Sequence, residues 1–396
     1  MDEENPHFQC RGQKGNALTA NIPFFRHDLG QPELDAVADV LAGPILTTGE
    51  TVARFEREFA NYLGSRNVLG VTSCTGALHM ALLALNIGPG DEVITTPMTF
   101  ASTSIAIEVV GAKPVFVDVE PDTGNLDAEK IEAAITDRTK AILPVHLFGL
   151  MCDMRAIRSI ADQYKLAVVE DAAHCVEGTR DGVRPGQLSD AACFSFFATK
   201  NLSCGEGGAL ATDRDDLVER LRLLRLHGMS KNSGARPVQR FAQWDMVMVG
   251  WKYNMDNIHA ALLLPQMRRI GYKLGQRHKL AEMYQNQLGE VDGIRIPATR
   301  PAATHARHMY PIWVDSAIRD VVANDLIDAG VGVVVPYPAV HLMSYFNQAL
   351  GHQIGDFPIT ERIADESIAL PFYPTMGCEA VQTVIDKLKR IIERHS

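Results

Sequence analysis

Short apolar runs alternate with amphipathic, helix-like stretches between residues 92 and 212. This alternation is typical of a mostly parallel sheet whose two faces are both covered, because each strand is then buried on both sides. In such sheets, ligands bind at the carboxyl ends of the strands. The sequence therefore predicts an α/β fold with functional side chains just after the apolar runs, which are Glu92–Thr96, Pro114–Asp118, Ala141–His146, Ala167–Asp171, Ala191–Phe197 and Gly208–Thr212.

The rest of the chain divides into three predicted parts. Residues 1–21 are polar and aperiodic, and we expect a mobile N-terminal arm without chemistry. Residues 22–266 would form a large domain, and residues 267–396 a small α+β C-terminal domain, with the boundary inside a long helical region over 255–288. The apolar spacing predicts further helices over 32–41, 51–63, 77–85, 127–135, 153–164 and 379–394, and a strand over 68–72.

Composition excludes several classes of protein. The net charge of −10 argues against binding to a nucleic-acid polymer, and no apolar stretch is long enough to span a membrane. The seven cysteines form no C-x-x-C pair, and the acidic start does not resemble a signal peptide. We therefore expect a reduced, cytoplasmic protein.

Several common catalytic motifs are also missing. The sequence contains no G-x-x-x-x-G-K-[ST], no H-E-x-x-H and no G-x-S-x-G. Histidines and cysteines are scattered without the spacing of metal ligands, so we expect no metal site.

Polar residues follow two of the predicted strands. Asp171 and His174 come at and after the end of one run, and Lys200 follows the run that contains Ser195. A lysine at the mouth of a buried sheet has a lowered pKa, as a Schiff-base lysine requires. A facing aspartate suits a protonated pyridine nitrogen, which makes the ring an electron sink.

Two further elements complete this pattern. Ser195 and the turn Thr72–Gly76 before a predicted helix offer hydroxyl and amide donors to a phosphate. Phe100 follows another strand, where its ring could stack on a planar group. Each feature alone is more often a helix cap, a surface lysine or a core residue, and only the joint pattern indicates a site.

The chain resembles the fold type I, pyridoxal-phosphate-dependent sugar aminotransferases of the DegT/DnrJ/EryC1/StrS family, from about residue 22 to the C-terminus. The fold that this resemblance implies is a large domain with a mostly parallel seven-stranded sheet, followed by a small α+β domain. The resemblance lies in ordered blocks, which are Leu46–Gly49, Ser73–Ala77, Gly90–Pro97, Pro144–Gly149, Glu170–His174, Ser195–Lys200, Gly205–Gly208, Arg225–Gly228 and Tyr253–Asn254. Within the family, segments 194–208 and 251–254 are most similar to UDP-4-amino-4-deoxy-L-arabinose aminotransferases.

The resemblance implies roles for the residues around the cofactor, pyridoxal 5'-phosphate. Lys200 would form the Schiff base and move the proton, Asp171 would pair with the pyridine nitrogen, and His174 would lie near the ring's phenolic oxygen. Phe100 would stack on the ring, and the phosphate would be held by Cys74, Thr75 and Ser195.

The resemblance also implies a shared active site. Asn254 would reach the phosphate of the other subunit's cofactor, so a homodimer is expected, and Thr48 would line the substrate side. Lys231 in the polar segment 230–243 is a candidate for binding a nucleotide diphosphate, with a solvated loop as the alternative. The family's His-Tyr-Pro block reads Pro336-Tyr337-Pro338 here, which puts the identity of the sugar in doubt.

The expected reaction moves an amino group from L-glutamate to a keto group of a nucleotide-linked sugar, at C4, in two half-reactions. A 3-ketosugar or a keto-cyclitol is the alternative acceptor. A sugar dehydratase of the same family is disfavoured because the branch carries His where Lys200 stands. From another class, a non-catalytic, PLP-binding regulatory protein is the alternative, and it would give a cofactor spectrum that glutamate never alters.

Overall fold

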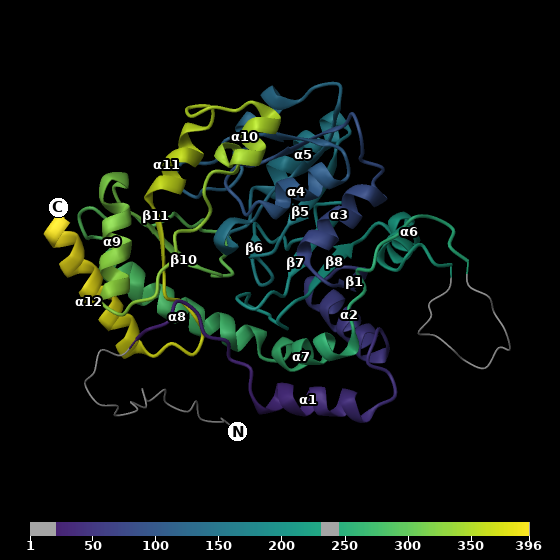
Figure 1. The fold of residues 1–396 in the computed structure, drawn as a ribbon, viewed down its shortest axis with the longest axis horizontal. Coiled ribbons are helices and arrows are strands. Elements are labelled where there is room, and N and C mark those ends of the chain that lie inside the picture. The colour runs from purple at the N-terminus through teal and green to yellow at the C-terminus, as the bar shows by residue number, and fades with distance from the viewer. Residues whose placement is uncertain (1–20, 231–244, 396) are drawn as a thin grey trace.

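The computed structural model describes residues 21–230 and 245–395. Its largest element is a seven-stranded sheet with the order β1-β8-β7-β5-β4-β2-β3 (Figure 1). All neighbouring pairs are parallel except those of β8, which runs antiparallel to both β1 and β7. The prediction of a mostly parallel α/β sheet is confirmed. The strands are β1 (Asn67–Val71), β2 (Glu92–Thr95), β3 (Lys113–Phe116), β4 (Thr139–Leu143), β5 (Ala167–Asp171), β7 (Ala191–Ser195) and β8 (Gly208–Thr212).

Successive residues of the strands point to opposite faces, so each strand contributes to two cores. In β7, Ala191 and Cys193 pack with helices α3, α4 and α6, whereas Ala192 and Phe194 pack with α2 and α7. A further cluster lies under α5. The helices of this part are α1 (Gln31–Ala42), α2 (Glu50–Leu63), α3 (Cys74–Ala84), α4 (Ser102–Val109), α5 (Met154–Tyr164), α6 (Asp215–Arg225) and α7 (Asn257–Met267).

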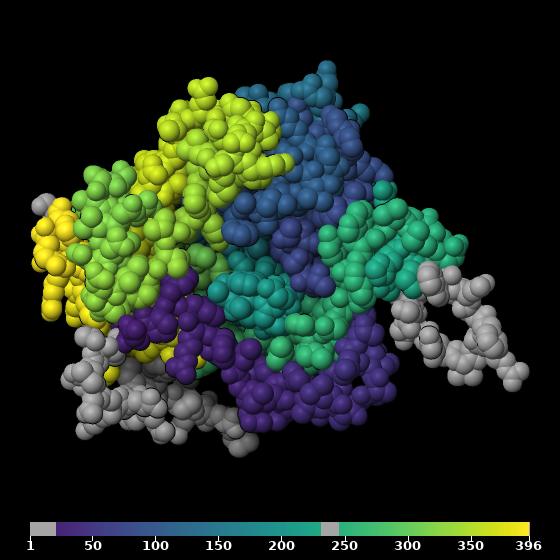
Figure 2. Space-filling view, in the orientation of Figure 1, coloured from purple at the N-terminus to yellow at the C-terminus, as the bar shows by residue number. Residues whose placement is uncertain are grey.

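The C-terminal part has a core of its own. It is built around the antiparallel pair β10 (Tyr310–Trp313) and β11 (Ser367–Leu370), which packs with α8 (Ile270–Leu288), α9 (Ser316–Asp328) and α12 (Cys378–His395). Ile22 joins this core through a bridge to Val331, and the purple N-terminal residues lie against it in Figure 2. The remaining helices here are α10 (Ser344–Leu350) and α11 (Pro358–Glu366).

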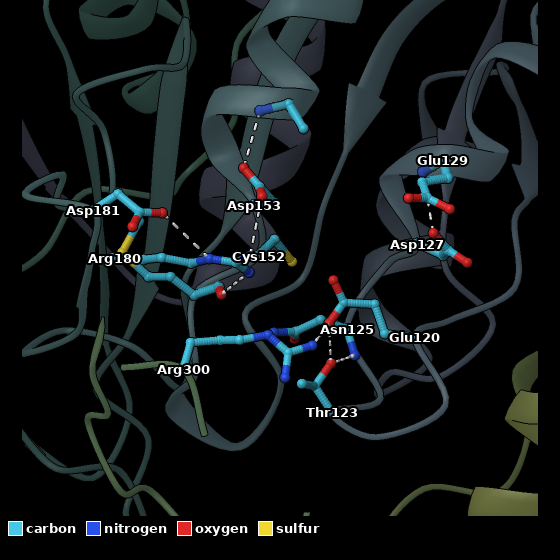
Figure 3. Close-up of polar contacts among 12 residues, drawn as sticks. Glu120, Thr123, Asn125, Asp127, Glu129, Cys152, Asp153, Arg180, Asp181 and Arg300 are labelled. Carbon is cyan, nitrogen blue, oxygen red and sulfur yellow. Dashed lines mark hydrogen bonds and ion pairs between the residues drawn. The ribbon is translucent and has the colours of Figure 1, made fainter. Parts of the chain in front are cut away.

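The segment that leads into this second core is fastened to the sheet part. The two-residue strand β9 (Ala303–Thr304) pairs with β6 (Thr179–Arg180). Arg300 donates to Glu120 Oε2 at 2.9 Å, and Arg180 donates to Asp153 Oδ2 at 3.0 Å (Figure 3). Because these ion pairs are partly exposed, each contributes modestly to stability. The Arg300 pair ties the segment directly to the sheet part, and the Arg180 pair anchors β6, with which β9 pairs.

Two helical predictions need correction or refinement. Residues 127–135 form two 3₁₀ turns, Ala128–Lys130 and Glu132–Ala134, instead of one helix. Only Ile131 of this stretch is fully buried, which leaves too little packing to stabilise so short an α-helix. The long helical region over 255–288 is divided, because α7 ends at Met267 and α8 begins at Ile270. No described helix is both long and apolar enough to cross a membrane.

Gly208 begins β8 where this strand passes the start of α3. A Cβ atom at Gly208 would lie 2.5 Å from the carbonyl carbon of Ser73, 2.6 Å from Cys74 N and 2.7 Å from Phe194 O. All three are backbone atoms, which cannot move aside as a flexible side chain can. We therefore expect Gly208→Ala to lower the free energy of unfolding by about 1–3 kcal/mol in chemical denaturation.

Gly275 on α8 is the matched control, because a Cβ there would meet nothing within 4 Å. Alanine is the better helix former, so Gly275→Ala should raise the free energy of unfolding by about 0.5–1 kcal/mol. Equal effects of the two substitutions would show that the close approach at Gly208 does not limit stability.

Candidate active site

Polar side chains converge at the carboxyl ends of neighbouring strands. Asp171 is the last residue of β5 and Ser195 the last residue of β7, while Ser73 and Cys74 follow β1. Lys200 lies five residues beyond the end of β7. β5 and β7 are neighbours, and β1 is separated from β7 only by the antiparallel β8, so the three carboxyl ends lie at one edge of the sheet, where an open α/β sheet binds its ligands.

The amine of Lys200 lies in a polar but poorly solvated setting. Its Nζ is 3.4 Å from Nε2 of His308. Burial lowers the pKa of Lys200 to about 8, although the negative charge of Asp171 opposes the shift. A lysine with this pKa carries a substantial neutral fraction near neutral pH, and a neutral amine is both a nucleophile and a base.

The carboxylate of Asp171 is 5% exposed and is held by three donors. Oδ2 accepts a hydrogen bond from the Thr103 hydroxyl at 2.8 Å, and Oδ1 accepts one from Ala173 N at 3.1 Å. The Cys74 thiol lies 3.8 Å from Oδ1. These contacts fix the direction in which the carboxylate faces the site.

The start of α3 forms a cradle for an anion. Ser73 caps the helix, since its Oγ accepts a hydrogen bond from Gly76 N at 3.0 Å. The first N–H groups of a helix have no intrahelical acceptor, so those of Cys74 and Thr75 are free to bind a phosphate. The Cys74 side chain does not act as a nucleophile here, because burial and Asp171 raise its pKa well above the usual range.

Two neutral histidines form one wall of the site. The rings of His174 and His308 stack with centroids 4.5 Å apart. Burial, followed by the charge of Lys200, lowers the pKa of both well below the usual value. Phe148 N donates to His174 Nδ1 at 3.3 Å, so the ring proton sits on Nε2, which lies 3.0 Å from the Tyr337 hydroxyl oxygen.

The other predicted residues lie at the margin of this cluster. Phe100 is 61% exposed, and its ring centroid is 6.2 Å from that of Tyr337. Asn254 and Thr48 form a separate pair, in which Asn254 Nδ2 donates to Thr48 Oγ1 at 2.6 Å. Lys231 lies outside the described residues.

The structure adds three residues that the sequence patterns did not single out as part of the site. Thr103 supports Asp171, His308 contacts Lys200, and Tyr337 bonds to His174. The Pro336-Tyr337-Pro338 block gave a partial signal, since it stands where the family has His-Tyr-Pro. Nothing in the local sequence around Thr103 or His308 distinguishes them from ordinary helix and loop residues.

This donor set fits pyridoxal phosphate. An amine for the aldehyde, a carboxylate for the pyridine nitrogen, and helix-start amides with the Ser195 hydroxyl for the phosphate all lie at one edge of the sheet. A Cβ at Gly208 would fill the space beside Cys74 N, so the missing side chain keeps this cradle open. In the described ranges 21–230 and 245–395, no group of three or more His, Cys, Asp or Glu side chains is placed to hold a metal ion.

Comparisons with known proteins agree with this chemistry. Spore coat polysaccharide biosynthesis protein SpsC of Bacillus subtilis is 39% identical over 378 residues, which cover 94% of this chain and 97% of SpsC. The crystal structure of the aminotransferase TlmJ from Streptoalloteichus hindustanus matches with 32% identity and a TM-score of 0.87, over 94% of this chain and 99% of TlmJ.

A putative sugar aminotransferase from Streptococcus pneumoniae, in its PMP form, has a TM-score of 0.89 and 28% identity, over 94% of this chain and 100% of its own. The model of the DegT/DnrJ/EryC1/StrS aminotransferase family matches residues 27–389. The predictions of the cofactor and of the reaction class are thereby confirmed. The chain is a pyridoxal-phosphate-dependent aminotransferase and belongs to the DegT/DnrJ/EryC1/StrS aminotransferase family.

Proposed function

We propose that the enzyme moves the amino group of L-glutamate to the C4 keto group of a nucleotide-linked sugar. The observation that supports the amino transfer is the buried amine of Lys200, which lies near the charge of Asp171 and has a pKa of about 8. A sugar acceptor is supported by the names of two relatives, one in polysaccharide biosynthesis and one a putative sugar aminotransferase. The resemblance of segments 194–208 and 251–254 to UDP-4-amino-4-deoxy-L-arabinose aminotransferases supports C4 and the nucleotide.

Each residue of the cluster has a proposed task in holding the cofactor. Asp171 keeps the pyridine nitrogen protonated, because its fixed carboxylate favours a positive charge at that point. When bound, pyridoxal phosphate would supply an electron sink for the reaction at Cα of the amino donor. Cys74 and Thr75 offer backbone amides to the phosphate, and Ser195 offers its hydroxyl.

Lys200 has two proposed tasks. It would hold the cofactor covalently, and its amine, when free and neutral, would accept the proton from Cα of the amino donor. His174 and Phe100 orient the ring, His174 near the phenolic oxygen and Phe100 against the ring face. Because His174 is neutral, it adds no positive charge that would compete with the protonated ring for Asp171.

The proposal includes a homodimer with shared sites. Asn254 Nδ2 gives one of its two hydrogens to Thr48 Oγ1 at 2.6 Å, and the second is the donor that a phosphate oxygen would need. We assign Asn254 to the phosphate of the partner's cofactor and Thr48 to the substrate side. Lys231 would meet the nucleotide diphosphate. The five buried cysteines, Cys74, Cys152, Cys175, Cys193 and Cys204, carry free thiols, which supports the proposed cytoplasmic location.

The acceptor is tested with a panel of nucleotide 4-keto and 3-keto sugars and keto-cyclitols. L-glutamate should first convert the cofactor to its amino form and remove the visible absorbance. A nucleotide 4-keto sugar should then restore the absorbance fastest. Restoration only by 3-keto sugars or keto-cyclitols would contradict the C4 assignment, and a spectrum that glutamate never changes would contradict the donor.

Replacing Lys200 tests its covalent role. Lys200→Ala should reduce turnover by at least about 1,000-fold, because both the covalent attachment and the proton transfer are lost. After borohydride reduction and denaturation, the wild-type chain should keep its cofactor and the variant should release it. Lys113→Ala, which removes an exposed lysine from β3, should behave as wild type. Wild-type turnover by Lys200→Ala would refute the assignment.

The proton affinity of Lys200 predicts a pH dependence. Only the neutral amine attacks an aldehyde, and the pKa of Lys200 is about 8. When pyridoxal phosphate is added to the cofactor-free chain, the rate of adduct formation should rise about tenfold per pH unit below this pKa and level off above it. Stopped-flow absorbance measures the profile. A midpoint near that of an ordinary exposed lysine would show that burial does not tune this amine.

A further inference from the structure

Arg277 is a buried cation that the proposed reaction does not use. It lies on α8 and is 2% exposed. Its Nη1 lies 3.1 Å from the carbonyl oxygen of Arg307 and 3.5 Å from that of His308. Burial lowers its pKa to about 10, and the carboxyl group of Glu177 opposes this shift. Because burying a guanidinium costs free energy, its contacts need an explanation.

The two carbonyl groups belong to a turn with an unfavourable backbone. Arg307 has a φ of 53°, in the left-handed region that residues with a side chain rarely adopt. The turn is fixed on its other side by His308 N, which donates to Phe148 O at 3.0 Å. Arg277 therefore stabilises a strained turn, and this turn positions the His308 ring in the site.

The turn places the His308 ring next to the amine of Lys200. His308 places Nε2 3.4 Å from Lys200 Nζ, with its ring stacked on His174. A second set of hydrogen bonds connects the residue after Lys200 with this region. Glu177 is 2% exposed and accepts a hydrogen bond from Asn201 Nδ2 at 2.9 Å. Asn201 follows Lys200 in the chain and also donates to Ala306 O at 2.7 Å.

We propose that Arg277 is a positioning residue, which holds His308 in place as the hydrogen-bond acceptor for the Lys200 amine. The inference rests on the role of Lys200 given above. Arg277 lines one small cavity together with Lys200 and Asn201, but its hydrogen bonds go to the backbone of residues 307–308, through which it acts. The second core of the molecule thereby controls the proton affinity of an amine at the edge of the sheet.

Several charged and titratable groups face Lys200 and bear on this control. Asp171 on β5 and the Cys74 thiol on α3 raise the pKa of the amine, whereas burial lowers it. His174 and His308 are neutral, but both ring nitrogens of His174 are used by Phe148 N and the Tyr337 hydroxyl, so His308 Nε2 is the acceptor for the ammonium group. Of these, His308 is the one whose position depends on Arg277.

The test measures the pH midpoint of pyridoxal phosphate capture by the full-length, cofactor-free chain. His308→Leu should lower the midpoint by about one pH unit, because the ammonium form loses its acceptor. Arg277→Met should lower it in the same direction by about half a unit, since the acceptor becomes misplaced. The double variant should show no more shift than His308→Leu, because both changes remove one interaction.

The direction in which the pH midpoint shifts distinguishes a positioning role of Arg277 from electrostatic repulsion between Arg277 and Lys200. If Arg277 acted on Lys200 as a nearby cation, its removal would raise the midpoint. Arg277→Lys keeps the cation but lacks the planar fork, so it should also lower the midpoint, by less than Arg277→Met. This variant decides the question if Arg277→Met does not fold.

Tyr284→Phe is the matched control. Tyr284 lies seven residues further along α8, is fully buried, and donates to a backbone carbonyl, that of Pro371, at 2.9 Å. Its removal should leave the midpoint at the wild-type value. An unchanged or raised midpoint in the Arg277 variants, a shift equal to that of Tyr284→Phe, or additive shifts in the double variant would overturn the proposal. A wrong sugar assignment would leave all these profiles unchanged, and a wrong role for Lys200 would show as capture by Lys200→Ala.

Discussion

The organisation of the site depends on the electrostatic balance between Lys200 and Asp171. Burial lowers the pKa of the lysine to about 8, and the aspartate limits how far it falls. Asp171 ends β5 and Lys200 follows β7, which is the neighbouring strand, so the fold itself sets their proximity. The balance would fail if water reached the amine freely, because solvation would restore its ordinary proton affinity. The surroundings of Lys200 are therefore as much a part of the chemistry as the two charged groups.

Those surroundings come from segments that are distant in sequence. Thr103 on α4 fixes Asp171, the start of α3 brings the amides of Cys74 and Thr75, and the segment after β9 brings His308. His174 and His308 stay neutral because they are buried next to a cation. A wall of neutral imidazole rings offers hydrogen bonds without adding a charge that would compete for Asp171. The site thus combines groups of opposite charge with a polar, uncharged lining.

The sequence predicted those features that depend on local patterns. The seven strands of the large sheet follow from continuous apolar runs, whereas the two-residue β6 was not predicted. The convergence of Asp171, Ser195 and Lys200 follows because strand ends of a parallel sheet share one edge. Thr103, His308 and Tyr337 depend on tertiary contacts that leave no periodic signal. The 3₁₀ turns over 128–134 replaced a predicted helix because packing decides the form of so short a segment. The contact of Ile22 with Val331 likewise joins residues more than three hundred positions apart.

The position of α8 explains how the two cores can act on one amine. This helix begins directly after α7, which packs on the sheet part, and it ends inside the second core with Tyr284 and Leu288. Arg277 lies between these ends and contacts the turn that carries His308. His308 is thus held from both sides, by Arg277 of α8 and by Phe148 of the sheet part, whereas the contacts given above for Asp171 come from Thr103, Ala173 and Cys74 of the sheet part. The proton affinity of the lysine therefore depends on the contact between the two cores, whereas the orientation of the aspartate does not.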